Sequence, residues 1–126
     1  MSLRKTILVL AAQLVALGAV FAMDVDSDLM RGIDDTTKSL DSDVAQKDAK
    51  AAAAEARELV ETFAKVESHY AEKSDTSDAA GFARKAQGYA ADAVKAIDAS
   101  DFDAAAEAVD KLTHSCKSCH DVYKKT

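Results

Sequence analysis

Residues 102–123 read FDAAAEAVDKLTHSCKSCHDVY, and this stretch decides the fold. Its apolar and cysteine positions recur at alternating intervals of three and four residues, the period at which one face of an α-helix returns. These positions are Phe102, Ala105, Val109, Leu112, Cys116, Cys119 and Tyr123. The alternation is typical of a helix packed in a bundle. We therefore expect both cysteines to continue a core-facing stripe rather than to lie on a surface loop.

The same helical pattern precedes this stretch three times. The chain has no proline, four glycines and abundant alanine, the strongest helix former. We expect helices at about residues 25–40, 44–73, 78–99 and 101–124. The second begins at Val44 or Asp48, because the Asp41-Ser42-Asp43 cluster suits a break and a new N-cap. Short joins between amphipathic helices predict an all-α protein, an antiparallel four-helix bundle.

The expected inner faces are short of large side chains. Their positions are Leu29, Met30, Ile33, Thr37, Leu40, Ala52, Ala56, Leu59, Phe63, Val66, Tyr70, Phe82, Ala86, Tyr89, Ala93 and Ile97. Alanines between facing helices leave room in the core. A bulky flat cofactor would fill that room and add buried apolar area.

Residues 1–22 have the layout of a secretory signal peptide. Arg4 and Lys5 precede an apolar run from Ile7 to Phe21, and Ala22 is a small residue at the expected cleavage point. The alternative is an uncleaved membrane anchor, although the run is short for a span of about 20 residues. The leader holds two basic residues and no acidic one, so cleavage changes the formal net charge from −6 to −8. We expect an exported domain of residues 23–126 that repels nucleic acid and anionic lipid and could attract a basic partner.

The motif Cys116-Lys117-Ser118-Cys119-His120 is a C-x-x-C-H, the pattern of covalent c-type haem attachment. On a helix, the two cysteines can each form a thioether to one vinyl group of a single haem. His120 follows Cys116 by four residues, so it shares that face and can reach the iron as an axial ligand.

Two other chemistries use closely spaced cysteines. Thioredoxin-like thiol exchange uses a C-x-x-C motif near a βαβ pattern, and this chain has no such pattern. A zinc site would have Cys116, Cys119, His120 and His114 nearby but no second ligand pair at the usual spacing. Haem attachment is the leading interpretation, and a haem-free thiol or metal-binding bundle stays as the alternative.

The C-terminal segment, residues 116–124, resembles the end of class II c-type cytochromes, the cytochrome c-prime family. The resemblance extends back to about residue 78, through Phe82-Ala83-Arg84-Lys85-Ala86, and covers the first half only in architecture. It implies a four-helix bundle with one haem c on the C-terminal helix. The join at residues 74–77 is shorter than is usual in the family, and Lys124 stands where the family often has arginine.

The resemblance also implies that the first helix supplies the residue over the distal face of the haem. Met30 lies there, and its thioether could bind the iron and give an electron carrier. Met30 could instead be ordinary core packing, which would leave an open site for small gases such as nitric oxide or carbon monoxide. His69, near the end of the second helix, is the rival ligand. His114 is expected to flank the site on its propionate side.

We therefore expect a periplasmic monohaem cytochrome that transfers single electrons, with His120 proximal and Met30 distal. The chain shows no carboxylate pair, Ser–His pair or glycine-rich phosphate loop, so we do not expect an enzyme. The expected partners are redox proteins, with a basic partner favoured by charge, and no nucleic acid or membrane after cleavage. Dimers are common in the family, so a homodimer is a state to test.

Overall fold

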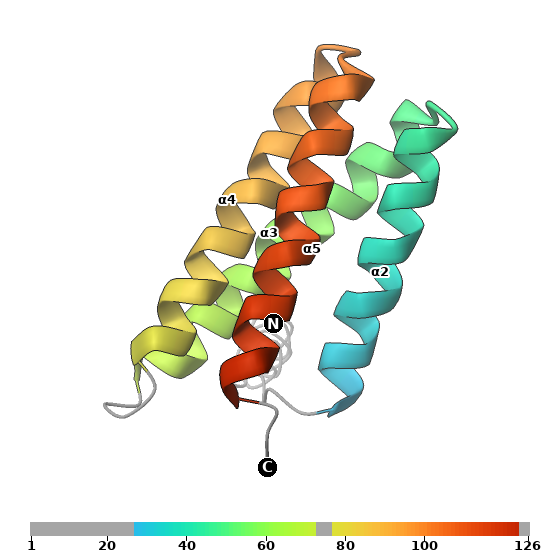
Figure 1. The fold of residues 1–126 in the computed structure, drawn as a ribbon. Helices are drawn as coiled ribbons and strands as arrows, with labels where there is room; N and C mark the ends of the chain where they lie inside the picture. The colour runs from blue at the N-terminus through green and yellow to red at the C-terminus, as the bar shows by residue number, and fades with distance from the viewer. Residues whose placement is uncertain (1–26, 73–76, 124–126) are drawn as a thin grey trace, which may run out of the picture.

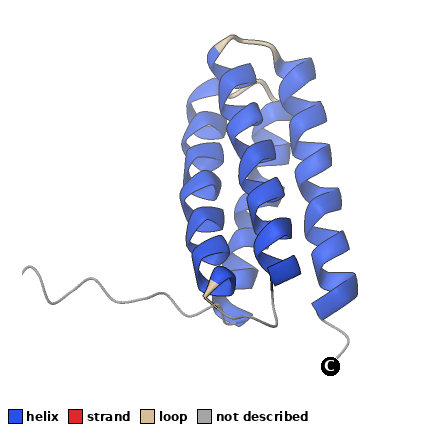
Figure 2. Ribbon diagram, turned by 90° about the vertical axis from the view of Figure 1, so that its left-hand side faces the viewer, coloured by secondary structure: helices blue, strands red, loops and turns tan. Residues whose placement is uncertain are grey.

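The computed structural model describes residues 27–72 and 77–123, which form four α-helices. The helices are α2 (Ser27–Ala45), α3 (Ala49–Ala71), α4 (Ser77–Asp98) and α5 (Phe102–Tyr123). They run antiparallel, and each packs against two neighbours in the order α2, α3, α4, α5 and back to α2 (Figure 1). Figure 2 shows the same bundle from the side, with helices and loops only in the described ranges. The predicted all-α four-helix bundle is confirmed.

The predicted break at residues 41–43 is wrong. Helix α2 continues through it to Ala45, because Val44 lies one helical turn beyond Leu40 and extends the buried stripe. Asp48, the second of the two expected starts, caps α3. Its Oδ1 accepts a hydrogen bond from the backbone N–H of Ala51 at 3.2 Å.

The two tight joins of the bundle have the same backbone geometry. Lys47 (φ 58°) follows α2 and Ser100 (φ 57°) follows α4, both in the left-handed region. After α2, the backbone N–H of Asp48 donates to the carbonyl of Asp43 at 2.9 Å. After α4, the backbone N–H of Asp101 donates to the carbonyl of Ala96 at 2.8 Å, and the Asp101 carboxylate then caps α5. These are Schellman endings, which usually place glycine at the left-handed position.

The core is built on small side chains from α4. The buried residues of that helix are Ala79, Ala80, Ala83, Ala86, Ala90, Ala93 and Ile97. Larger residues face them from the other helices, and Leu40, Leu59, Val109 and Leu112 are the largest that are fully buried. Thr37 is buried as expected, and its hydroxyl donates to the carbonyl of Ile33 at 2.8 Å.

None of the described helices combines the length and the apolar character that crossing a membrane requires. The leader at residues 1–22 and the join at residues 74–76 lie outside the described ranges, as does Lys124. The predictions made for them remain predictions.

Candidate functional site

A cavity lies at the end of the bundle where α2 and α4 begin and where α3 and α5 end. It encloses about 640 Å³ of empty space, part of which is open solvent at the surface. All four helices contribute to its lining, which is mainly apolar. The largest apolar contributors are Met30, Ile33, Phe63, Val66 and Phe82.

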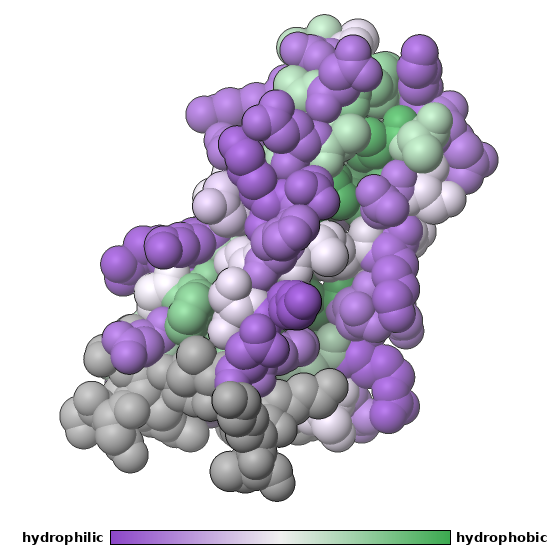
Figure 3. Space-filling view, viewed as in Figure 1, coloured by the Kyte–Doolittle hydropathy of each residue, from purple (hydrophilic) through white to green (hydrophobic). Residues whose placement is uncertain are grey.

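The alanine side chains on the inner face of α4 leave room for this cavity. Ala79, Ala83 and Ala86 lie on three successive positions of the α4 stripe, and all three line it. On the opposite side, α2 and α5 share the least extensive contact of the four neighbouring pairs. Figure 3 shows polar side chains over the outward face of α5 and apolar ones between α5 and α2. Buried alanines run along the whole bundle, and the cavity lies at the end where α2 and α4 begin.

Helix α5 brings the predicted attachment residues to this cavity. Cys116, Cys119 and His120 all line it, with both cysteines half-buried and His120 exposed. Both cysteines are free thiols. The core stripe of α5 positions them, since Leu112 is buried one turn and Val109 two turns before Cys116.

Burial makes both thiols weak acids. It is the main reason that the pKa of Cys116 is raised from 9.0 to about 11, and the neighbouring Cys119 and Asp34 add to the shift. Burial also raises the pKa of Cys119. A thiol in this state is a poor nucleophile and a poor metal ligand at neutral pH. The site does not resemble that of a low-pKa redox dithiol.

Helix α2 places Met30 on the same cavity. Met30 is half-buried, packs against the core and lines the cavity from α2, a neighbour of the helix that carries His120. The thioether and the imidazole thus belong to one cavity, as the sequence analysis expects of two axial ligands.

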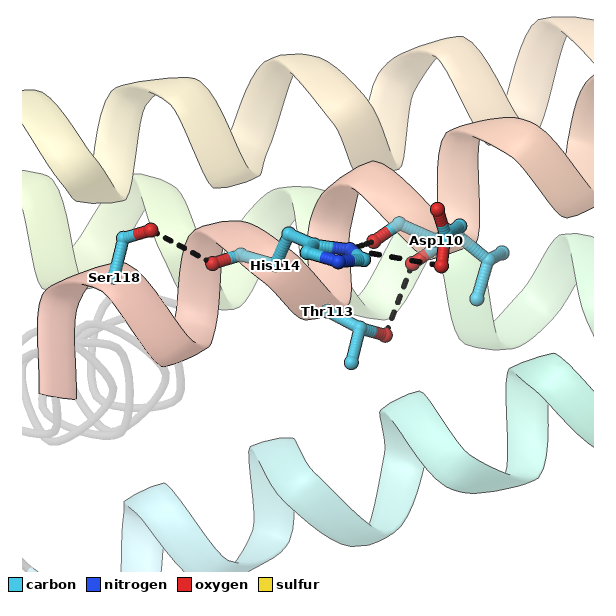
Figure 4. A network of polar contacts seen from close by, with 5 residues as sticks. Asp110, Thr113, His114 and Ser118 are labelled. Carbon is cyan, nitrogen blue, oxygen red and sulfur yellow. Dashed lines mark hydrogen bonds and ion pairs between the residues drawn. The ribbon is translucent and has the colours of Figure 1, made fainter. Parts of the chain in front are cut away.

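The two other histidines lie elsewhere. His69 is not among the residues that line the cavity, and its ring packs edge-to-face on Tyr70 with centroids 5.1 Å apart. His114 is largely exposed on the outer side of α5. Its Nδ1 lies 2.8 Å from the carbonyl oxygen of Asp110, within the run of polar contacts in Figure 4. Neither position favours these histidines as groups facing the cavity.

Ser115 is a site residue that the helical stripe did not predict. Its side chain is buried and lines the cavity, and its Oγ has no hydrogen-bond partner among the described residues. Its neighbours Thr113 and Ser118 donate instead to the carbonyls of Val109 and His114, both at 3.0 Å. A buried hydroxyl without a partner is costly, and an ordered water or a bound group usually satisfies it. Its position directly before Cys116 was the only available signal.

The residues present fit a covalent c-type haem. Two thiols one helical turn apart line an apolar cavity, an imidazole lies at the next position, and a thioether lines the same cavity from α2. Among the described residues, no cluster of three or more histidine, cysteine or acidic side chains is arranged to hold a bare metal ion. An apolar pocket with few polar groups suits a porphyrin better than a hydrated cation.

The fold and the cavity thus define a class: four-helix bundle proteins with a C-x-x-C-H haem-attachment motif on the last helix. Comparison with known families agrees, since residues 22–124 match the family described as cytochrome c′. The chain belongs to the cytochrome c′ family. No significant match to a curated protein or to a solved structure was found. Membership of this family makes the chain a c-type cytochrome and implies a covalently bound haem c.

Proposed function

We propose that this protein is a periplasmic monohaem electron carrier in which His120 and Met30 are the two axial ligands of the iron. The observation that carries the proposal is the shared cavity, which His120 lines from α5 and Met30 from α2. The bound haem would supply a one-electron iron couple, and the chain would supply attachment, ligands and burial.

Each residue has a separate task in this proposal. Cys116 and Cys119 fix the cofactor to α5, which the buried Val109 and Leu112 hold against the bundle. The exposed His120, which also lines the cavity, would then bind the iron through its imidazole. Met30, on α2, would bind the iron through its thioether, which favours the ferrous state and would leave no open coordination position.

The export and partner assignments also belong to the proposal. The leader at residues 1–22 supports export, because covalent haem attachment takes place outside the bacterial cytoplasm. A net charge of −8 after cleavage supports a basic redox partner. Single-electron exchange with such a partner, rather than substrate turnover, is the activity that these features support.

One observation favours a second candidate, a five-coordinate protein that binds small gases. Met30 packs against the core cluster, and a methionine committed to packing would leave the distal side of the iron open. The two candidates share the same attachment site. They differ only in whether the Met30 sulfur binds the iron.

A redox titration of the natively exported, haem-loaded protein tests the electron-carrier proposal. The absorption spectrum should change reversibly with a one-electron slope and stay low-spin in both oxidation states. A high-spin ferrous spectrum would contradict ligation by Met30 and favour the gas-binding candidate. An intact mass without a haem adduct would contradict both.

A further inference from the structure

Asp34 places a carboxylate on the wall of the cavity. It lies on α2, one helical turn after Met30, and it is the one acidic residue among the described residues that line the cavity. Asp34 and the next residue, Asp35, are both exposed, but Asp35 does not line the cavity. The two adjacent aspartates therefore differ in whether they face the site.

Lys38 holds this carboxylate in place. Its Nζ donates a hydrogen bond to Asp34 Oδ2 at 2.6 Å, across one turn of α2. Lys38 itself does not line the cavity. The pair thus presents its negative member to the cavity and its positive member away from it.

The charge of Asp34 acts on the attachment site of α5. After burial and the neighbouring Cys119, the Asp34 carboxylate is the third contribution that raises the pKa of Cys116. A carboxylate that disfavours a thiolate at this sulfur also disfavours added negative charge on a group bound there.

This inference rests on the proposed function. We propose that the Asp34 carboxylate lowers the reduction potential of the haem held by Cys116, Cys119 and His120, because its negative charge favours the oxidised state. Reduction adds one electron to the site, so a fixed negative charge on the wall lowers the potential. The positive charge of Lys38, the partner of Asp34 in the ion pair, offsets part of this lowering of the potential. Asp34 acts through the field and is not itself an iron ligand.

The test is the midpoint potential of three haem-loaded variants, measured at low ionic strength. Asp34→Asn should raise the potential and Lys38→Gln should lower it, while Asp35→Asn serves as the matched control with little change. Both differences should shrink at high salt, because the pair is exposed. A merely structural role would move the first two variants in the same direction, since each breaks the same ion pair.

Two results would overturn the inference. One is an equal shift in Asp34→Asn and Asp35→Asn, which would reflect net charge alone. The other is a shift of the same sign in Asp34→Asn and Lys38→Gln. Failure of the proposed function looks different, because it appears as a mass without haem or as the loss of a reversible couple in the unmodified chain.

A readout without haem keeps the inference testable in that case. In the haem-free full chain, Asp34→Asn should increase the alkylation of Cys116 at pH 9 relative to Asp35→Asn. Identical alkylation rates across pH in the two variants would show that Asp34 exerts no specific field at Cys116, and would overturn the inference.

Discussion

Met30 on α2 and His120 on α5 line one cavity, with free Cys116 and Cys119 beside His120. The helices meet at this end of the bundle because α2 begins and α5 ends there. The cavity thus brings a thioether and an imidazole from two neighbouring helices to one site.

Replacing Met30 by leucine should convert the protein from a closed to an open iron site. The change nearly conserves volume, so it should cost less than about 1.5 kcal/mol of stability. We expect the haem to stay attached, the ferrous form to become high-spin and the potential to fall. The control His69→Gln should leave the absorption spectrum and potential unchanged, and the reverse pattern would make His69 the ligand.

Leu112→Ala should strongly destabilise the bundle. Leu112 is fully buried on α5, one turn before Cys116, and its truncation leaves a cavity that typically costs ~2–5 kcal/mol. Urea unfolding of the haem-loaded protein measures the change. Glu107→Gln, on the exposed face of the same helix, should shift stability by less than about 0.5 kcal/mol. A similar effect of both changes would contradict the packing described for α5.

Lys47→Gly should stabilise the join between α2 and α3. Lys47 has φ 58°, a conformation that costs a non-glycine residue ~1–2 kcal/mol, although glycine loses part of this gain to unfolded-chain entropy. Thermal unfolding should show a higher midpoint for this variant. Lys65→Gly, at an exposed position in the interior of α3, should instead lower stability by about 1 kcal/mol. A fall in both variants would argue against the left-handed ending of α2.

Raising the pH should destabilise the haem-free folded chain. The pKa of Cys116 is about 11 in the fold and 9.0 when solvated, so the unfolded chain loses this proton first. The folded state therefore keeps its full stability below pH 9 and loses part of it between pH 9 and pH 11. Denaturant midpoints measured across this range should fall, and Cys116→Ala should flatten the slope. A slope unaffected by this substitution would place the thiol in solvent.

Much of the fold could be predicted from periodicity. The three-and-four spacing from Phe102 onward located α5 and its buried face, and Val109 and Leu112 are buried as expected. The break predicted at Asp41-Ser42-Asp43 is wrong because these three capping residues lie within a buried stripe that continues to Val44. A local capping preference stabilises a helix boundary less than burial of a side chain stabilises the helix. The left-handed residue that follows α2 is Lys47, so no glycine marks the ending in the sequence.

The candidate site was partly predictable in the same way. The C-x-x-C-H motif gave the residues on α5, since its spacing is local and its chemistry specific. Ser115 and Asp34 could not be found from sequence, because their importance depends on which side chains meet across helices. The shortage of volume beside α4 could be anticipated from its alanines, but the position of the cavity at one end of the bundle could not.

The most direct test of the central claim is the absorption spectrum of the ferrous, haem-loaded protein before and after carbon monoxide is added. Ligation by both Met30 and His120 leaves no open position on the iron, so the spectrum should remain low-spin and unchanged. Rapid formation of a carbon monoxide complex by the native protein would contradict the assignment of Met30.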